Sequence, residues 1–159
     1  MERYAGMCEP MCAVNLAAHI SWLQAIPLGE WPQQDRMSAD CQYPAMVTNP
    51  EWCGFGNRFH DLVTELMFNF PKHVAVNKYL SIVMPKQCIL DHDDVFDEPW
   101  RVRIHVPLIT NPQATMWFGQ EVFHMEVGTA YKVNTEINHG LANMGDEPRI
   151  HFFFDVRAQ

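Results

Sequence analysis

The chain has few basic residues and no long apolar run, and both shortages exclude classes of protein. Lys and Arg together number 11 in 159 residues, against 19 Asp and Glu, so the formal net charge is -8. An acidic chain of this kind is a poor nonspecific ligand for nucleic acid or for an anionic membrane surface. No segment approaches the ~20 consecutive apolar residues of a membrane-spanning helix. We therefore expect neither a nucleic-acid partner nor membrane contact.

The cysteine spacing and the first residues of the sequence lead us to expect neither a disulfide framework nor a secretory signal. The chain has an odd number of cysteines, and they are Cys8, Cys12, Cys41, Cys53 and Cys88. Cys8 and Cys12 are close enough in sequence to bind one metal ion, but no second close pair completes a zinc site. The first residues, Met-Glu-Arg-Tyr, do not lead from a charged region into an apolar run. We expect reduced thiols and a cytoplasmic protein.

What is present is enough apolar material for a compact core. Hydrophobic residues make up 48% of the chain and charged residues 19%, which excludes disorder and predicts one globular domain over 1–159. Within it, residues 1–72 are predicted to form a helical and irregular support region. Apolar residues at helical spacing predict helices over 13–26 and 57–70, while the Pro- and Gly-containing stretch 27–56 is expected to be mostly irregular.

From residue 73 onward the chain consists of short β-rich runs. They cover residues 74–84, 101–109, 116–118, 121–127, 129–133 and 149–156. Several short strands separated by turn signals, here at Gly119 and Gly128, are typical of an all-β sandwich or barrel. The expected fold is mainly β: a double-stranded β-helix (jelly roll, cupin-like), formed by residues 73–159, with the N-terminal helices packed on one side.

The most informative motif is His92-Asp93-Asp94, followed by His139 and Arg149. Side chains two apart on a strand point the same way, so His92 and Asp94 can reach one ion. Two imidazoles and one carboxylate are the ligand set of a non-haem Fe(II) oxygenase, which fills one face of the ion and leaves positions open. Arg149 supplies a fixed positive charge suited to the far end of a dicarboxylate.

The alternative is that residues 91–94 form only an acidic surface loop, since an isolated His-x-Asp is common by chance. The β context, the later histidine and the arginine together favour the metal site. His124-Met-Glu126 is the main internal competitor, but no His-then-Arg pair follows it. The remaining histidines, His19, His60 and His73, are interpreted as structural or exposed, and His151 as a pocket residue beside Arg149.

Arg103 and His105 share one face of a strand whose other face carries Ile104 and Val106. Polar groups facing inward from such a strand are costly unless they are paired. They are either internally hydrogen-bonded or bound to an anion.

These residues resemble the aspartyl/asparaginyl β-hydroxylase family, which also contains the free-proline hydroxylases. The resemblance runs from about Lys78 to Val156. It is carried by Tyr79-Leu-Ser-Ile-Val-Met-Pro85, His92-Asp93-Asp94, Arg103-Ile-His-Val-Pro-Leu108, Asn138-His-Gly140 and Arg149-Ile-His-Phe-Phe-Phe-Asp-Val156. The aspartyl hydroxylases proper have no acidic residue at the position of Asp94, so its presence favours the proline-hydroxylase-like branch.

The resemblance implies an enzyme that uses Fe(II), 2-oxoglutarate and O₂ and releases succinate and CO₂. It implies that His92, Asp94 and His139 are the catalytic metal ligands. Arg149, helped by Ser81, would hold the distal carboxylate of 2-oxoglutarate. Arg103 and His105 match residues near its metal-proximal carboxylate.

The expected activity is hydroxylation of an amino acid, an amino-acid residue in a peptide or a related small molecule. Two competing hypotheses use the same barrel: a cupin-like metal-binding protein or metalloenzyme without 2-oxoglutarate, and a catalytically silent jelly roll that binds partners. Arg149 argues against the first, because a site for metal alone needs no such cation. The complete ligand triad argues against the second, because unpaired buried His and Asp would destabilise the fold. Trp117 and Phe118 are candidates either for the cavity wall or for the core.

Overall fold

The computed structural model describes residues 6–11, 16–25, 45–48, 56–94 and 102–159, in which two helices and two antiparallel sheets are found. The helices are α1 (Leu16–Gln24) and α2 (Gly56–Met67). The strands are β1 (Cys8–Met11), β2 (Ala45–Thr48), β3 (His73–Val83), β4 (Gln87–His92), β5 (Val102–Ile109), β6 (Ala114–Phe118), β7 (Glu121–Phe123), β8 (Ala130–Val133), β9 (His139–Asn143) and β10 (Arg149–Ala158).

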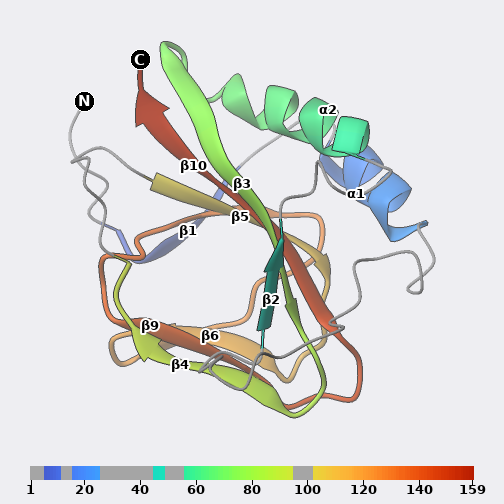
Figure 1. Ribbon diagram of the computed structural model, residues 1–159, viewed down its shortest axis with the longest axis vertical. Helices are drawn as coiled ribbons and strands as arrows, with labels where there is room; N and C mark the ends of the chain where they lie inside the picture. The colour runs from blue at the N-terminus through green and yellow to red at the C-terminus, as the bar shows by residue number, and fades with distance from the viewer. Residues whose placement is uncertain (1–5, 12–15, 26–44, 49–55, 95–101) are drawn as a thin grey trace.

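The larger sheet has the strand order β1-β8-β5-β10-β3-β2, and the smaller sheet has the order β4-β9-β6-β7. The two sheets face each other, and the chain passes back and forth between them (Figure 1). This is the jelly-roll, cupin-like arrangement expected from the sequence, and both helices lie together on the outer side of the larger sheet. The fold prediction is therefore confirmed.

Strands β5 and β10, at the centre of the larger sheet, are largely buried on both faces. In β10, Ile150, Phe152, Phe154 and Val156 pack with the helices in one apolar core. The intervening side chains of β10 belong to the opposite face, which looks into the barrel. A second, smaller core lies between the sheets and contains Val83, Ile89, Met116, Phe118, Met125, Val133 and Leu141. The polar side chains of the barrel-facing side are the ones that build the site.

Several expected elements differ in extent from the structure. Helix α2 ends at Met67, before the predicted end at residue 70, and α1 ends at Gln24; residues 13–15 and 26 lie outside the described part of the chain. Within the stretch 27–56, predicted to be mostly irregular, Ala45–Thr48 form edge strand β2 and Gly56 begins α2, while the other residues lie outside the described part of the chain. Strand β7 ends at Phe123, shorter than the predicted run to residue 127. The sequence predicts β4 only at its His92 end, and it predicts neither β1 nor β9.

The described helices have 9 and 12 residues. Among the described residues, none of the helices has the length and apolar character needed to cross a membrane.

Candidate functional site

Strands β4 and β9 bring His92, Asp94 and His139 together at one end of the smaller sheet. His92 is the last residue of β4 and lies directly opposite His139, the first residue of β9. Each of the three residues offers a ligand atom, and these atoms all lie within 4.8 Å of one another. Nε2 of each imidazole is 3.9 Å from an oxygen of Asp94. The predicted triad is thus assembled, although Asp94 follows the end of β4 rather than lying within it.

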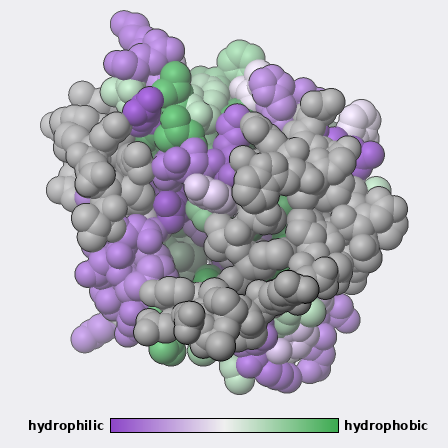
Figure 2. Space-filling model, viewed as in Figure 1, coloured by the Kyte–Doolittle hydropathy of each residue, from purple (hydrophilic) through white to green (hydrophobic). Residues whose placement is uncertain are grey.

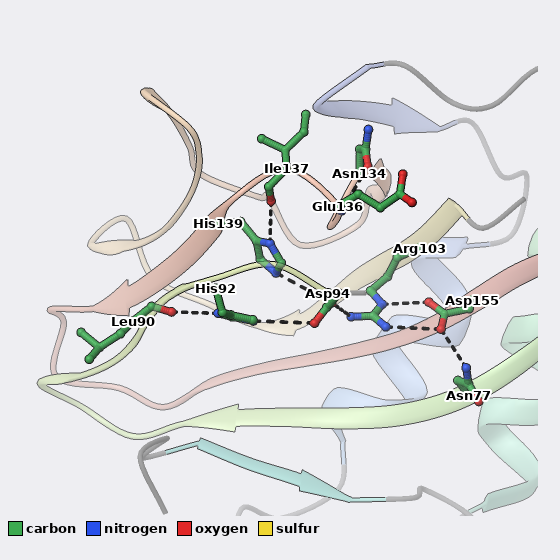
Figure 3. A network of polar contacts seen from close by, with 10 residues as sticks. All are labelled: Asn77, Leu90, His92, Asp94, Arg103, Asn134, Glu136, Ile137, His139 and Asp155. Atoms are coloured by element: carbon green, nitrogen blue, oxygen red, sulfur yellow. Dashed lines mark hydrogen bonds and ion pairs between the residues drawn. The ribbon is translucent and has the colours of Figure 1, made fainter. Parts of the chain in front are cut away.

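The two histidines have the same tautomer, set by the backbone. Nδ1 of His92 donates to the carbonyl of Leu90 at 2.8 Å, and Nδ1 of His139 donates to the carbonyl of Ile137 at 2.9 Å. Because a carbonyl only accepts, the hydrogen is on Nδ1 and the lone pair is on Nε2, which faces Asp94 (Figure 3). Burial, the largest cause, lowers the pKa of His139, which favours the neutral, metal-binding form.

Arg103 connects the triad to the larger sheet. Its Nη1 binds Asp94, while its Nε and Nη2 donate to the carboxylate of Asp155 at 2.8 and 3.3 Å. Asn77 donates to the same carboxylate at 3.0 Å. Figure 3 shows the resulting line of contacts from Leu90 through His92, Asp94 and Arg103 to Asp155 and Asn77. Arg103 therefore holds a candidate metal ligand between the two sheets.

Arg149 is a buried cation whose hydrogen bonds among the described residues, unlike those of Arg103, go to neutral groups. It is 2% exposed, and burial lowers its pKa to about 9, so it remains charged at neutral pH. Nη1 donates to Ser81 Oγ at 3.3 Å and Nη2 donates to His151 Nδ1 at 2.8 Å. Within the described part of the chain, no carboxylate pairs with it. A buried guanidinium in this state is a site for an anion.

His105 lies between the triad and Arg149. Burial, the largest cause, lowers its pKa well below 6.5, and the charges of Arg149, Arg103 and His139 lower it further. Its ring stacks on Phe153, with centroids 5.2 Å apart, and meets the ring of His151 edge-on. His105 is therefore close enough to both His139 and Arg149 for their charges to act on it.

Two buried atoms of this pocket, His105 Nδ1 and His151 Nε2, have no hydrogen-bond partner among the described residues. Thr135 Oγ1 has none among these residues either, although the carbonyl of Thr135 accepts from the backbone N–H of Asp94. Because His151 accepts from Arg149 at Nδ1, its hydrogen is on Nε2, which makes this atom an unused donor. Such atoms are costly unless a ligand satisfies them. The ligand set of the triad suits a transition metal ion. The unused Nε2–H of His151 beside Arg149 suits an anionic ligand.

Other predicted residues have different positions. His124 donates from Nδ1 to the carbonyl of Ala114 at 2.9 Å, and neither it nor Glu126 belongs to the only group of potential metal ligands found in the described residues. Phe118 is buried and stacks on His139, whereas Trp117 is directed to the other face of its strand. His60 is exposed, and His19 and His73 are partly buried. Cys8 and Cys88 are free thiols, while Cys12, Cys41 and Cys53 lie outside the described residues.

The sequence interpretation missed Asp155 and Asn77. Asp155 is fully buried, and a signal for it existed: it is the acidic residue in the run Phe152-Phe-Phe-Asp-Val, six positions from Arg149 and thus on the same strand face. Asn77 had no such signal. Its φ of 51° belongs to an irregularity in β3, where Asn77 and Lys78 stand opposite the single residue Phe154. Asparagine tolerates that conformation, but its position depends on a pairing with a distant strand.

Comparison with known proteins agrees with this geometry. The model of the aspartyl/asparaginyl beta-hydroxylase family matches residues 48–159. No curated protein sequence matches the chain.

Solved structures match nearly the whole chain at low identity. HygX from Streptomyces hygroscopicus, with nickel and 2-oxoglutarate bound, has a TM-score of 0.68 at 10% identity, covering 96% of this chain and 83% of its own. The viral collagen prolyl hydroxylase of Paramecium Bursaria Chlorella virus-1, a 2-oxoglutarate complex, has 0.62 at 11%, covering 98% and 97%. A Pseudomonas putida prolyl-4-hydroxylase has 0.64 at 12%, covering 98% and 94%. These likenesses show a shared fold.

Proposed function

Because the chain belongs to the aspartyl/asparaginyl β-hydroxylase family of 2-oxoglutarate-dependent oxygenases, we propose that it is an Fe(II)-dependent hydroxylase of an amino acid, an amino-acid residue or a related small molecule. The observation that carries the proposal is the combination of the triad with Arg149. A metal-ligand set and an uncompensated buried cation face the same barrel interior, with His105 between them.

In this proposal His92, Asp94 and His139 hold Fe(II) through two imidazole nitrogens and one carboxylate oxygen. Three protein ligands leave coordination positions for 2-oxoglutarate and O₂. The oxidising chemistry belongs to the iron and its co-substrates: decarboxylation yields succinate and CO₂, and the substrate gains a hydroxyl group. The protein orients the reactants and excludes water from the barrel.

The pocket around Arg149, Ser81 and His151 would bind the distal carboxylate of 2-oxoglutarate. Arg149 would pair with the distal carboxylate, and Ser81, already 3.3 Å from the guanidinium, would share it. The unused Nε2–H of His151 is a further donor in the same pocket. The neutral His105 has no hydrogen-bond partner at Nδ1 among the described residues, so this atom could bond to the metal-proximal carboxylate of 2-oxoglutarate.

We propose that Arg103 positions the carboxylate of Asp94, in addition to any contact it makes with 2-oxoglutarate. Its contacts with Asp94 and Asp155 support a positioning role, because they fix the carboxylate that a metal ion would use. The role near the metal-proximal carboxylate, implied by the family resemblance, remains a prediction.

The substrate class is also a proposal. Two of the solved relatives are prolyl hydroxylases by name, and Asp94 matches the branch of the family that contains free-proline hydroxylases. Proline, free or in a peptide, is therefore the first substrate to test. Figure 2, in the same view as Figure 1, shows a small recess near the centre of this face, and we propose that the substrate enters there. A cytoplasmic location remains a prediction.

The test measures 2-oxoglutarate binding and succinate release by the purified protein with Fe(II) under air. Arg149→Met removes the cation from a buried site of similar size, and we expect it to abolish saturable 2-oxoglutarate binding. Arg58→Met is the matched control, because Arg58 is exposed on α2 and donates to the carbonyl of Trp22, far from the triad. Binding that is indifferent to Arg149→Met would refute the proposal.

The alternative is a cupin-like metal protein that does not use 2-oxoglutarate. It shares the triad but has no use for Arg149. Metal binding that requires His139, together with no 2-oxoglutarate binding by the parent protein, would favour this alternative.

A further inference from the structure

Trp117 lies on the outer face of the smaller sheet, away from the metal ligands. In β6, Ala114, Met116 and Phe118 are buried toward the barrel, so Thr115 and Trp117 face outward. The residue paired with Trp117 on β7 is Val122, which is 65% exposed. The indole Nε1 donates to Asp91 Oδ1 at 2.6 Å. A tryptophan at a sheet surface thus bonds to the residue immediately before His92.

Asp91 belongs to a β-bulge in β4. Ile89 pairs with Leu141 and His92 pairs with His139, so the two residues Leu90 and Asp91 stand opposite the single residue Gly140. Ile89 faces the inner core. Three positions later, a regular strand would turn His92 outward, because side chains alternate. The extra residue of the bulge reverses the alternation and turns His92 inward.

The bulge also supplies the carbonyl that orients His92. Leu90, its other extra residue, accepts the hydrogen bond from His92 Nδ1 at 2.8 Å. The direction of the side chain and the tautomer of the ring therefore both depend on the same two residues.

Gly140 leaves the space that the indole needs. A Cβ atom at this position would lie 2.7 Å from Cε2 of Trp117 and 2.9 Å from the carbonyl oxygen of Ile89. Both distances are shorter than a nonbonded contact allows. The ring therefore lies across the strand beside the bulge, where only glycine fits.

We propose that Trp117 is a positioning residue for metal binding: its hydrogen bond to Asp91 clamps the bulge that turns His92 toward the ion. This inference rests on the proposed function, since it assumes that His92 is a metal ligand. A tryptophan retained only for apolar packing would be replaceable by phenylalanine, which keeps a ring but lacks the N–H donor.

The experiment measures Co(II) affinity by calorimetry and the visible absorption of bound Co(II), which reports its ligands. For Trp117→Phe we expect a Kd weaker by roughly 10- to 100-fold, the usual effect of losing a group that orients a ligand, and a changed Co(II) spectrum. Asp91→Ala should weaken binding similarly. Asp91→Asn keeps an oxygen acceptor and should restore most of the affinity and the parent spectrum.

Val122→Ala is the matched control, because it alters the same outer face at the residue paired with Trp117 but touches no bulge contact. Thermal unfolding without metal separates a loss of stability from a loss of affinity. Equal Kd values and spectra for the parent protein, Trp117→Phe and Asp91→Ala would overturn this inference alone. A parent protein that does not bind Co(II) would overturn the proposed function as well.

Discussion

Two arginines facing the barrel interior differ in how their charge is balanced. Arg103 contacts two carboxylates, Asp94 and Asp155, whereas Arg149 contacts only the neutral Ser81 and His151 among the described residues. A buried charge is stable when it is paired, and an unpaired one attracts a counter-ion. An anionic ligand is therefore expected to bind at Arg149, whereas Arg103 is already paired with Asp94 and Asp155.

Asp155→Asn tests the function of the ion pair between Arg103 and Asp155. The change removes one of the two carboxylates that Arg103 contacts, so Arg103 should compete more strongly with a metal ion for Asp94. We expect a Kd for Co(II) weaker by about 10-fold, measured by calorimetry, as for other groups that orient metal ligands. An unchanged Kd in the folded variant would contradict the role.

Asn77→Gly provides a milder version of the same test. Glycine accepts the φ of 51° at this position, so the backbone is kept while the hydrogen bond to Asp155 is lost. The affinity should fall in the same direction as in Asp155→Asn, but by less, because both bonds from Arg103 to Asp155 remain.

At the scale of the elements, bulges redirect the side chains that form the site. The bulge in β4 turns His92 inward, and the irregularity in β3 brings the amide of Asn77 to Asp155. Regular alternation would supply an apolar face and a polar face but not these directions. The helices contribute differently, because they cover the outer face of the larger sheet and keep the site strands in place.

Phe59→Ala tests how much the packing of the helices on the larger sheet contributes to the free energy of unfolding. Phe59 on α2 is 1% exposed, and its ring lies 4.8 Å from that of Phe152 on β10. Removing a buried phenylalanine side chain typically lowers the free energy of unfolding by about 3–5 kcal/mol. Urea denaturation followed by circular dichroism measures the loss. Phe68→Ala, just beyond the end of α2 and 79% exposed, should change the stability little; equal losses would contradict the packing argument.

At the scale of the whole molecule, the sequence predicted the fold through the strands that alternate. Runs such as Arg103-Ile-His-Val carry a period of two and were located within one or two residues. Strand β4 is predicted only at its His92 end because its bulge breaks that period, and β9 is not predicted because Gly140 and Ala142 face outward without a polar signal. The edge strands β1 and β2 are four residues each, and their pairing depends on distant segments that no local pattern reveals.

The candidate site was predictable to a similar degree. His92, Asp94, His139 and Arg149 were identified because their residue types and spacing indicate metal and anion binding, whereas Ser81 was identified only through the family resemblance. The structure brings the three metal-ligand candidates together. The role of each residue stays a prediction that the binding experiments decide. The contacts of Arg103 with Asp155 could not be predicted, because they depend on the register between β5 and β10.

The same buried histidines that serve the pocket should make the whole molecule sensitive to acid. His105 and His151 are 5% and 2% exposed, and for both, burial first and the charge of Arg149 second lower the pKa well below 6.5. His124 also acts on His151, and the two pocket rings meet edge-on. Protonating either ring in the folded protein would place a second positive charge beside the guanidinium.

The direction of the pH dependence follows from these lowered pKa values. Above 6.5 both rings are neutral in the folded and unfolded chain, so their stabilising contribution is complete. As the pH falls below 6.5, the unfolded chain takes up protons that the folded protein cannot, so the free energy of unfolding decreases, by up to about 1.4 kcal/mol per pH unit for each ring.

Urea denaturation at about pH 7.5 and about pH 5.5 measures this loss. His151→Gln should reduce it, whereas His60→Gln, at an exposed position on α2, should not. If both variants lost the same stability as the parent protein between the two pH values, protonation of His151 would not be the cause, and the acid sensitivity would have to arise elsewhere in the molecule.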